Sequence, residues 1–324
     1  MNSRLLTEQE YCLWDEFVNS SPQGSIFSCT WYLKALQVDY SILAIVEGGC
    51  IKAGLVLPKN EVNLLSNPML DKYLGIMLPN CSSSFKNTSR LYKYIEVLAE
   101  ALSNFRSFDY YFHPNFKNWI PMYWNGFTQQ TRYTYRIDNT VRSLDDIYND
   151  FHGNLRNDIK NSLKEGVTIN QDVEFDDLWG GISSTFLRQG GNPPFNKNQL
   201  SRFISEVRQN KAFMSFGAYS AQGFCLAACG LIFDRNSSYL LLNGFDSSAG
   251  VRGANAHLIY NTIQFCHSKF KYYDFEGSML PGVEPFYRKF GGELTPYMRI
   301  WNDNIFNYVK VKAKIMYKKI RFGK

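Results

Sequence analysis

Residues 271–298 decide the fold of this chain, and they read KYYDFEGSMLPGVEPFYRKFGGELTPYM. An apolar, aromatic run opens the stretch, breaks at the Glu-Gly-Ser of 276–278 and leads into a Pro-Gly turn. An amphipathic segment follows over 283–290 and ends at two glycines. This order predicts a short buried strand, a loop and a short helix. Strand ends of this kind often bind ligands in α/β proteins, although a buried strand before a capped helix gives the same pattern without any site.

Three elements of this stretch resemble the C-terminal signature of the FemAB-like branch of the GNAT acyltransferase superfamily. They are Asp-Phe-x-Gly at 274–277, Phe-Tyr-Arg-Lys-Phe-Gly-Gly at 286–292 and Pro-Tyr at 296–297. The resemblance is strongest over 144–298 and fainter over 5–76. It implies an enzyme that joins an activated acyl group to an amine and is built of two GNAT-type domains.

The first part of the chain has the element order of one GNAT unit. We expect two helices before residue 36, and then a hairpin whose strands, 40–47 and 50–58, flank a Gly-Gly turn. A helix over 84–105 and a strand over 110–112 follow. A polar stretch up to about residue 140 then marks the crossover to a second domain.

The second part of the chain is expected to have a similar order of helices and strands. Helices are expected after the N-cap Ser143 and over 176–187 and 199–209, and a three-stranded meander follows. A Gly-containing loop then opens a helix that runs to His267. We therefore expect an α+β (mixed α/β) fold with two GNAT-type domains, 1–140 and 141–324, each a mostly antiparallel mixed sheet flanked by helices.

Composition agrees with a globular chain of two domains. The 324 residues are 45% hydrophobic and 20% charged, which is not the composition of a disordered protein. Seven scattered cysteines without a Cys-x-x-Cys pair predict buried free thiols in a reducing compartment. The first residues contain no apolar core of signal-peptide length, so we expect a cytoplasmic protein.

The sequence lacks the motifs of several classes of enzyme. The four histidines lie far apart, none at metal-ligand spacing from a cysteine or acid, and we therefore expect no metal site. No Gly-x-Ser-x-Gly or Walker A sequence occurs, so hydrolase and NTPase functions have no support. Attack of an amine on a thioester or ester is compatible with the lack of these motifs, because the reaction requires only positioning of the reactants, loss of a proton and an oxyanion donor.

The candidate catalytic residues lie in the opening stretch. Glu276 is the expected general base, because partial burial would raise its pKa, and a loop acid that caps a turn is the alternative. Tyr287 stands where many relatives have lysine, and it is expected to donate a proton to the leaving group or a hydrogen bond to the oxyanion, unless it is only a buried aromatic. Arg288 and Lys289 are expected to hold a phosphate or carboxylate, or one of them is a surface cation.

Further binding residues are expected upstream. Arg156, Lys160 and Lys164 share one helix face, which is either solvated or directed at a phosphate, and Arg188 ends a helix before two glycines. The loop before the helix that ends at His267 offers backbone N–H groups to a pyrophosphate. By resemblance of element order, its cofactor-binding residues are expected to be Gly250, Arg252, Gly253 and Asn255.

The expected function is N-acyl transfer to an amine acceptor that belongs to a cell-envelope or polysaccharide precursor or a lipid. Acyl-CoA is the favoured donor and co-substrate, because the long helical hairpin of tRNA-dependent Fem-type transferases is not seen in the sequence. Two alternatives remain open: a Fem-type peptidyltransferase that uses aminoacyl-tRNA, and a non-catalytic protein that binds an anionic ligand in the same fold.

The last sixteen residues, 309–324, carry six lysines, one arginine and no acid. Apolar residues recur among these cations at a spacing that predicts a basic amphipathic helix. Such a helix would hold the protein at an anionic membrane surface, whereas tRNA is a less favoured partner and a solvated tail is the alternative.

Overall fold

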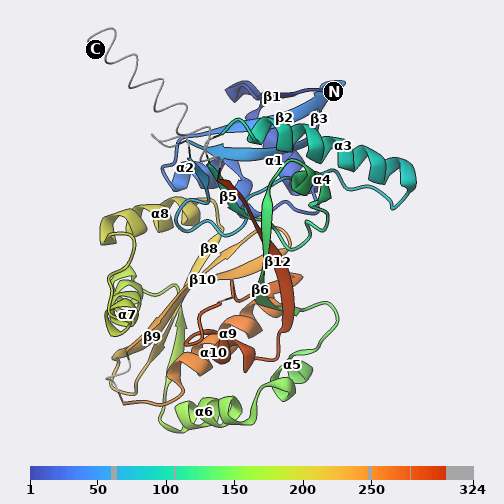
Figure 1. The fold of residues 1–324 in the computed structure, drawn as a ribbon. Coiled ribbons are helices and arrows are strands. Elements are labelled where there is room, and N and C mark those ends of the chain that lie inside the picture. The colour runs from blue at the N-terminus through green and yellow to red at the C-terminus, as the bar shows by residue number, and fades with distance from the viewer. Residues whose placement is uncertain (60–63, 106, 247–249, 278, 304–324) are drawn as a thin grey trace, which may run out of the picture. The chain divides into compact units, whose positions relative to one another are not determined.

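The computed structural model describes residues 1–59, 64–105, 107–246, 250–277 and 279–303 (Figure 1). The described chain divides into two units, one made of Met1–Arg132 with the chain from Tyr297 onward, the other of Tyr133–Pro296. The chain enters the second unit within β6 (Thr128–Asp138) and leaves it within β12 (Glu293–Asp303). Within the described chain the second unit ends at Pro296, and the domain bounds 1–140 and 141–324 stay a prediction. The expected helix over 309–324 lies outside the described residues.

The first unit contains an antiparallel sheet and a second set of three paired strands. β2 pairs with both β1 and β3, and β5 pairs parallel with β4 and antiparallel with the end of β12. The Gly-Gly hairpin is confirmed as β2 and β3. The strand bounds are β1 (Ser3–Leu5), β2 (Tyr40–Glu47), β3 (Cys50–Pro58), β4 (Leu64–Ser66) and β5 (Ser107–Tyr111).

Helices complete the first unit. The longest, α3, begins after Ser84, whose hydroxyl accepts the backbone N–H of Asn87, and buries one apolar face. The prediction that two helices precede any strand is wrong, because β1 comes first and pairs with β2. The helices are η1 (Glu8–Glu10), α1 (Tyr11–Ser20), η2 (Ile26–Ser28), α2 (Thr30–Ala35), α3 (Phe85–Leu102) and α4 (Ile120–Trp124).

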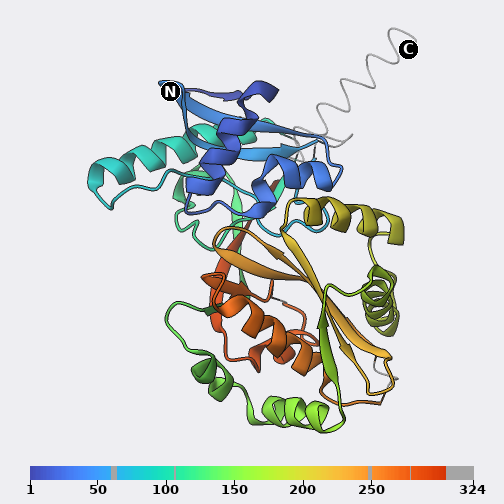
Figure 2. The ribbon, with the colours of Figure 1, turned by 180° about the vertical axis from the view of Figure 1, so that it is seen from behind.

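The second unit contains a sheet in the order β6-β11-β10-β9-β8-β7. The twist of its strands is visible in Figures 1 and 2. β10 and β11 are parallel, and the other neighbours in this order are antiparallel. The predicted meander is confirmed as β8, β9 and β10. The bounds are β7 (Thr168–Gln171), β8 (Phe213–Tyr219), β9 (Cys225–Phe233), β10 (Ser237–Phe245) and β11 (Tyr272–Asp274).

Helices cover this sheet on both faces. The main apolar core lies on the side of α9, whose buried residues pack on β8, β9 and β10. α7 packs on the opposite face of β9 and β10, where Gly181 directly faces Gly244. The helices are α5 (Leu144–Asp150), α6 (Gly153–Lys164), α7 (Phe175–Arg188), α8 (Lys197–Gln209), α9 (Ala254–His267) and α10 (Glu284–Arg288).

The cysteines are less buried than expected. Cys29, Cys229 and Cys266 are buried, as predicted, and the seven sulfurs form no disulfide. Cys12 and Cys50 are exposed, as is Cys81. The prediction of buried thiols is wrong for these three, because each lies on a helix surface, at a strand end or in a connection rather than beneath a sheet. Of the helices in the described ranges, none is both long and apolar enough to cross a bilayer.

Candidate functional site at the divergence of two parallel strands

The candidate site lies where β10 and β11 separate. These strands pair over three residues each, Ser237–Tyr239 with Tyr272–Asp274. β10 then continues along β9 to its end, with a bulge after Leu240. The chain after β11 instead stays on β6, where Phe275 donates its backbone N–H to the carbonyl of Tyr135 at 3.0 Å. The two strands therefore diverge, and the sheet opens at a point that side chains must fill.

Glu276 is held in a strained turn at this divergence. Its φ is +56°, a conformation that side chains other than glycine seldom adopt, and Gly277 follows with φ +46°. Its backbone N–H donates to Asp274 Oδ1 at 2.8 Å. A Cβ on Gly277 would lie 2.4 Å from the Cα of Thr134, so only glycine lets the turn approach β6 this closely. One carboxylate oxygen of Glu276, Oε1, is buried.

A buried polar network supports that turn. Asp274 is fully buried and accepts a hydrogen bond from Thr134 Oγ1 at 2.6 Å. Its other oxygen, Oδ2, lies 3.4 Å from Nε of Arg136, which is also buried and stacks over the ring of Tyr272. A buried carboxylate is tolerable only when it is paired and hydrogen-bonded, and this network supplies both. Asp274 therefore fixes the backbone from which Glu276 projects.

Tyr287 reaches the same point from α10. Its ring lies 5.6 Å from that of Phe275, centroid to centroid. Burial is the main cause that raises the pKa of its phenol to about 12; a hydrogen bond from the Asn243 side chain opposes the rise, and the Glu276 carboxylate adds a smaller contribution to it. The phenol is therefore protonated at neutral pH and can act as a donor. Glu276 lies 11 positions before Tyr287 in the sequence and close enough to it to influence the pKa of the phenol, while the catalytic roles of both stay a prediction.

Asn243 is a member of this group that the sequence did not reveal. It lies on β10 beyond the bulge, opposite Cys229 of β9, in the otherwise apolar run Leu-Leu-Leu-Asn-Gly-Phe of 240–245. A single polar residue inside a buried strand was the available signal. The amide oxygen, Oδ1, is buried and has no hydrogen-bond partner among the residues that the structure describes.

Four cations of the second unit are expected from the sequence to bind a phosphate or carboxylate. Arg288 is 63% exposed and lies 3.6 Å from Glu284, one helical turn away. Lys289 contributes its backbone carbonyl, which accepts the N–H of His152. Arg156 donates to the carbonyl of Asn149 and Lys160 is exposed on the surface of α6. Arg288 and Arg156 thus have local partners and Lys160 is solvated, while the phosphate-binding role of the four cations stays a prediction.

Arg188 lies at the far end of β10. Its guanidinium stacks over the ring of Phe245, 4.1 Å from the centroid, and Nη1 donates to the Phe245 carbonyl at 3.2 Å. The Thr185 hydroxyl accepts the Phe245 N–H at 3.0 Å. Arg188 thus ties the end of α7 to β10, a packing role that the sequence pattern could not indicate.

The loop before α9 has features that suit an anion and others that serve packing. Gly253, with φ +89°, is the N-cap of α9 and offers no side-chain cap, so the first N–H groups of the helix remain for a ligand. A Cβ at Gly253 would lie 2.0 Å from the carbonyl of Asp158, so this glycine also lets α6 pack closely. Arg252 is 75% exposed and pairs with Asp158 at 2.6 Å. Gly250 has φ +72°, and Asn255 Oδ1 is buried.

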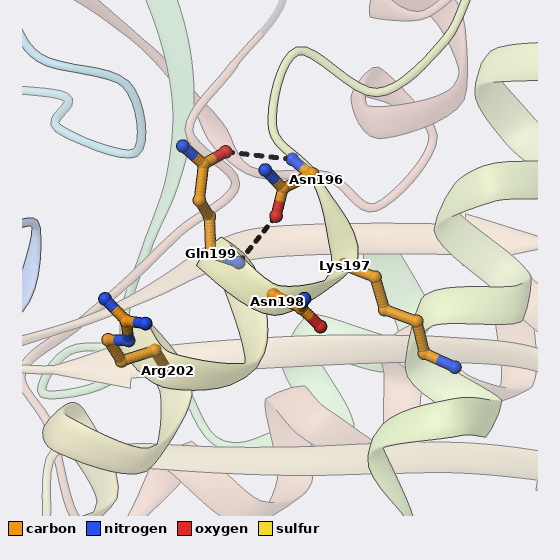
Figure 3. A pocket seen from close by; sticks show the side chains of 5 residues that line it. All are labelled: Asn196, Lys197, Asn198, Gln199 and Arg202. Atoms are coloured by element: carbon orange, nitrogen blue, oxygen red, sulfur yellow. Dashed lines mark hydrogen bonds between the residues drawn. The ribbon is translucent and has the colours of Figure 1, made fainter.

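Two surface hollows are lined by neither Glu276 nor Tyr287. One, of about 370 Å³, lies at the N-terminus of α8, where Asn196 and Gln199 cap the helix reciprocally (Figure 3). The other, of about 510 Å³, lies beside α7 and the start of β9 and is lined by Asp176 and Asp177, among others. In the described ranges, no three His, Cys, Asp or Glu side chains form a group that could hold a metal ion.

Comparison with known proteins identifies the fold. No protein-family model matches the sequence, and no curated protein does. The crystal structure of FemX matches with a TM-score of 0.68 at 14% identity, over 92% of this chain and 97% of that one. The chain has a FemX-like fold. This result confirms the resemblance to FemAB-like and GNAT proteins and the mixed α/β fold class.

Two further structures share the FemX-like fold. A tandem GNAT protein from the clavulanic acid biosynthesis pathway matches with a TM-score of 0.53 at 8% identity, over 93% of this chain and 97% of its own. L-PGS from Bacillus licheniformis matches with a TM-score of 0.55 at 12% identity, over 92% of each chain. Identities this low establish the fold and leave the chemistry to the site itself.

Proposed function

We propose that this protein is an N-acyltransferase that forms an amide from an activated acyl donor and an amine. The observation that carries the proposal is that a carboxylate, Glu276, lies near a protonated phenol, Tyr287, where β10 and β11 diverge. A base and an acid at one point are what acyl transfer to an amine requires. Similarity in fold to a GCN5-related N-acetyltransferase from Sphaerobacter thermophilus, with a TM-score of 0.52 at 11% identity over 92% of this chain and 94% of that one, supports the same reaction class.

The reaction follows from these two groups. The neutral amine attacks the acyl carbon, a C–N bond forms, and Glu276 accepts the proton that the nitrogen loses. Tyr287 donates its proton to the departing sulfur as the C–S bond breaks, so a free thiol is released with the amide. Solvent then takes the proton from Glu276 and returns one to Tyr287. The raised pKa of Tyr287 suits a donor that must stay protonated until a thiolate develops beside it.

Acyl-CoA is the donor that we favour. The uncapped N-terminus of α9 would receive its pyrophosphate, with the backbone at Gly250 and Gly253 and the exposed guanidinium of Arg252 beside it. Asn255 lies in the first turn of the same helix. When bound, the coenzyme supplies the thioester that makes the acyl carbon reactive.

The acceptor is proposed to be an amine on a cell-envelope precursor or a lipid. The fold is also that of the C-terminal domain of a putative lysylphosphatidylglycerol synthetase from Agrobacterium fabrum, with a TM-score of 0.55 at 12% identity, over 90% of this chain and 92% of that one. Lysylphosphatidylglycerol, after which that protein is named, is a lipid, which supports a lipid-linked acceptor. Peripheral membrane contact through the basic residues 309–324 of a cytoplasmic protein belongs to the same proposal.

The test follows thiol release from acyl-CoAs in the presence of primary amines. Glu276→Gln should lower turnover by about 10²-fold or more, the usual contribution of a general base, without changing the unfolding midpoint. Glu96→Gln, on the exposed face of α3, is the matched control and should match the wild-type rate. Thiol release by wild type that Glu276→Gln leaves unchanged would remove Glu276 from the role. No release with any acyl-CoA would instead favour an aminoacyl-tRNA donor or a non-catalytic binding protein.

A further inference from the structure

The side chain of Asn243 carries an acceptor that the protein itself does not use. Its amide oxygen is buried and makes no hydrogen bond to any described residue, while its amide nitrogen is directed at the phenol oxygen of Tyr287. Leucines precede it on β10, and the facing residue on β9 is Cys229, which is fully buried. Leucine would fit this apolar environment without a buried amide oxygen, so the unsatisfied oxygen of asparagine costs stability here.

The position of this oxygen indicates what would satisfy it. An amide oxygen accepts hydrogen bonds and cannot donate one, so its partner must carry an N–H or O–H group. The residues gathered around Tyr287 include Glu276, the group proposed above to take the proton from the attacking nitrogen. An attacking amine has more than one N–H, and only one of these protons is removed. A second acceptor is needed to direct the lone pair at the acyl carbon.

We propose that Asn243 Oδ1 accepts a hydrogen bond from the N–H of the primary amine substrate and orients its nitrogen for attack. This inference rests on the proposed amide-forming activity and names the substrate class that this part of the site takes, a primary amine. Asn243 is then a substrate-binding residue, whereas Glu276 takes the proton. An amide cannot accept that proton at neutral pH, so the two acceptors have distinct roles.

A binding experiment tests the inference without turnover. Protein labelled with ¹⁵N at asparagine shows the side-chain amide signals, and the Asn243 pair is the one missing from Asn243→Leu. Titration with n-butylamine should shift this pair. The control ligand, n-butyltrimethylammonium, has the same charge and no N–H, and it should not shift the pair. Equal shifts with both ligands, or no shift with n-butylamine, would overturn the inference.

A stability comparison separates a binding role from a structural one. Asn243→Leu removes both an unsatisfied buried oxygen and the hydrogen bond to Tyr287, so its urea midpoint should fall less than that of a variant that loses only satisfied hydrogen bonds. Asn67→Leu is the control, since Asn67 bonds Asp71 at 3.1 Å and accepts the N–H of Tyr111 at 3.0 Å, and this variant should unfold earlier. A fall in midpoint for Asn243→Leu as large as that of the control would show that Asn243 is structural.

Kinetics complete the test where transfer is measurable. With an acyl-CoA donor and n-butylamine, Asn243→Leu should raise the KM for the amine about tenfold, the effect of one lost hydrogen bond, and leave the KM for the donor unchanged. A rise in the donor KM instead would assign Asn243 to the acyl donor and overturn the inference. If wild type transfers nothing, the proposed function fails, and the amide titration still decides whether Asn243 binds an amine.

Discussion

Replacing Gly244 with alanine should loosen α7 from β10 beside the proposed site. A Cβ added at Gly244 would lie 2.2 Å from the carbonyl carbon of Gly181, 2.3 Å from its oxygen and 2.4 Å from the nitrogen of Ile182. All three are backbone atoms, so no change of rotamer can relieve the clash. The helix and the strand must separate by roughly 1 Å, and overpacking of this kind costs about 3 kcal/mol of unfolding free energy.

The neighbouring glycine of α7 provides the control. A Cβ at Gly180 meets no atom within 4 Å, and alanine is the better helix former. Gly180→Ala should therefore stabilise the protein by up to about 1 kcal/mol. Replacing glycine with alanine is therefore expected to lower the free energy of unfolding at position 244 and to raise it at position 180.

Urea unfolding followed by circular dichroism measures both variants against wild type. The midpoints should fall for Gly244→Ala and stay or rise for Gly180→Ala, with a difference in unfolding free energy of about 4 kcal/mol between them. A Gly244→Ala midpoint equal to that of wild type would refute the reasoning, because it would mean that α7 does not rest on Gly244. Loss of stability in both variants would show that the helix tolerates no side chain on either face.

Three further predictions concern the polar groups of the second unit. Burial lowers the pKa of His257, whose ring forms a hydrogen bond with Ser162, so the folded state binds fewer protons than the unfolded state. The free energy of unfolding should therefore fall as the pH drops through about 6.5. Urea unfolding at a series of pH values should show this fall in wild type and not in His257→Leu. Tyr287→Phe should lower turnover by about 10²-fold, and because the phenol has a pKa of about 12, the wild-type pH profile should show no loss from its ionisation below pH of about 10. Thr134→Val removes the hydroxyl that donates to Asp274 and should cost about 2 kcal/mol in urea unfolding, whereas an unchanged midpoint would mean that the carboxylate is satisfied without it.

Local patterns in the sequence were enough for most helices and for the hairpins. The Gly-Gly turn predicted β2 and β3, and the N-cap Ser143 predicted the start of α5, since turn residues and N-caps act over a few positions. β6 and β12 were not predicted. β6 is rich in polar residues and β12 contains Pro296, so neither has a strand-like pattern of its own. They are strands because β11 and β5 pair with them.

Some residues of the candidate site could also be proposed from the sequence, whereas others were found only in the tertiary structure. Glu276 and Tyr287 could be proposed from the sequence because a strand, a loop and a helix lie in succession there, and short connections keep such residues close. Thr134 and Asn243 belong to the site through pairings between segments far apart in the chain. Arg156 and Lys160 had a suggestive helical spacing, but spacing says only which face they share. Whether that face meets a ligand or solvent depends on what packs opposite it, and only the tertiary structure decides this, because long-range contacts leave no periodic trace in the sequence.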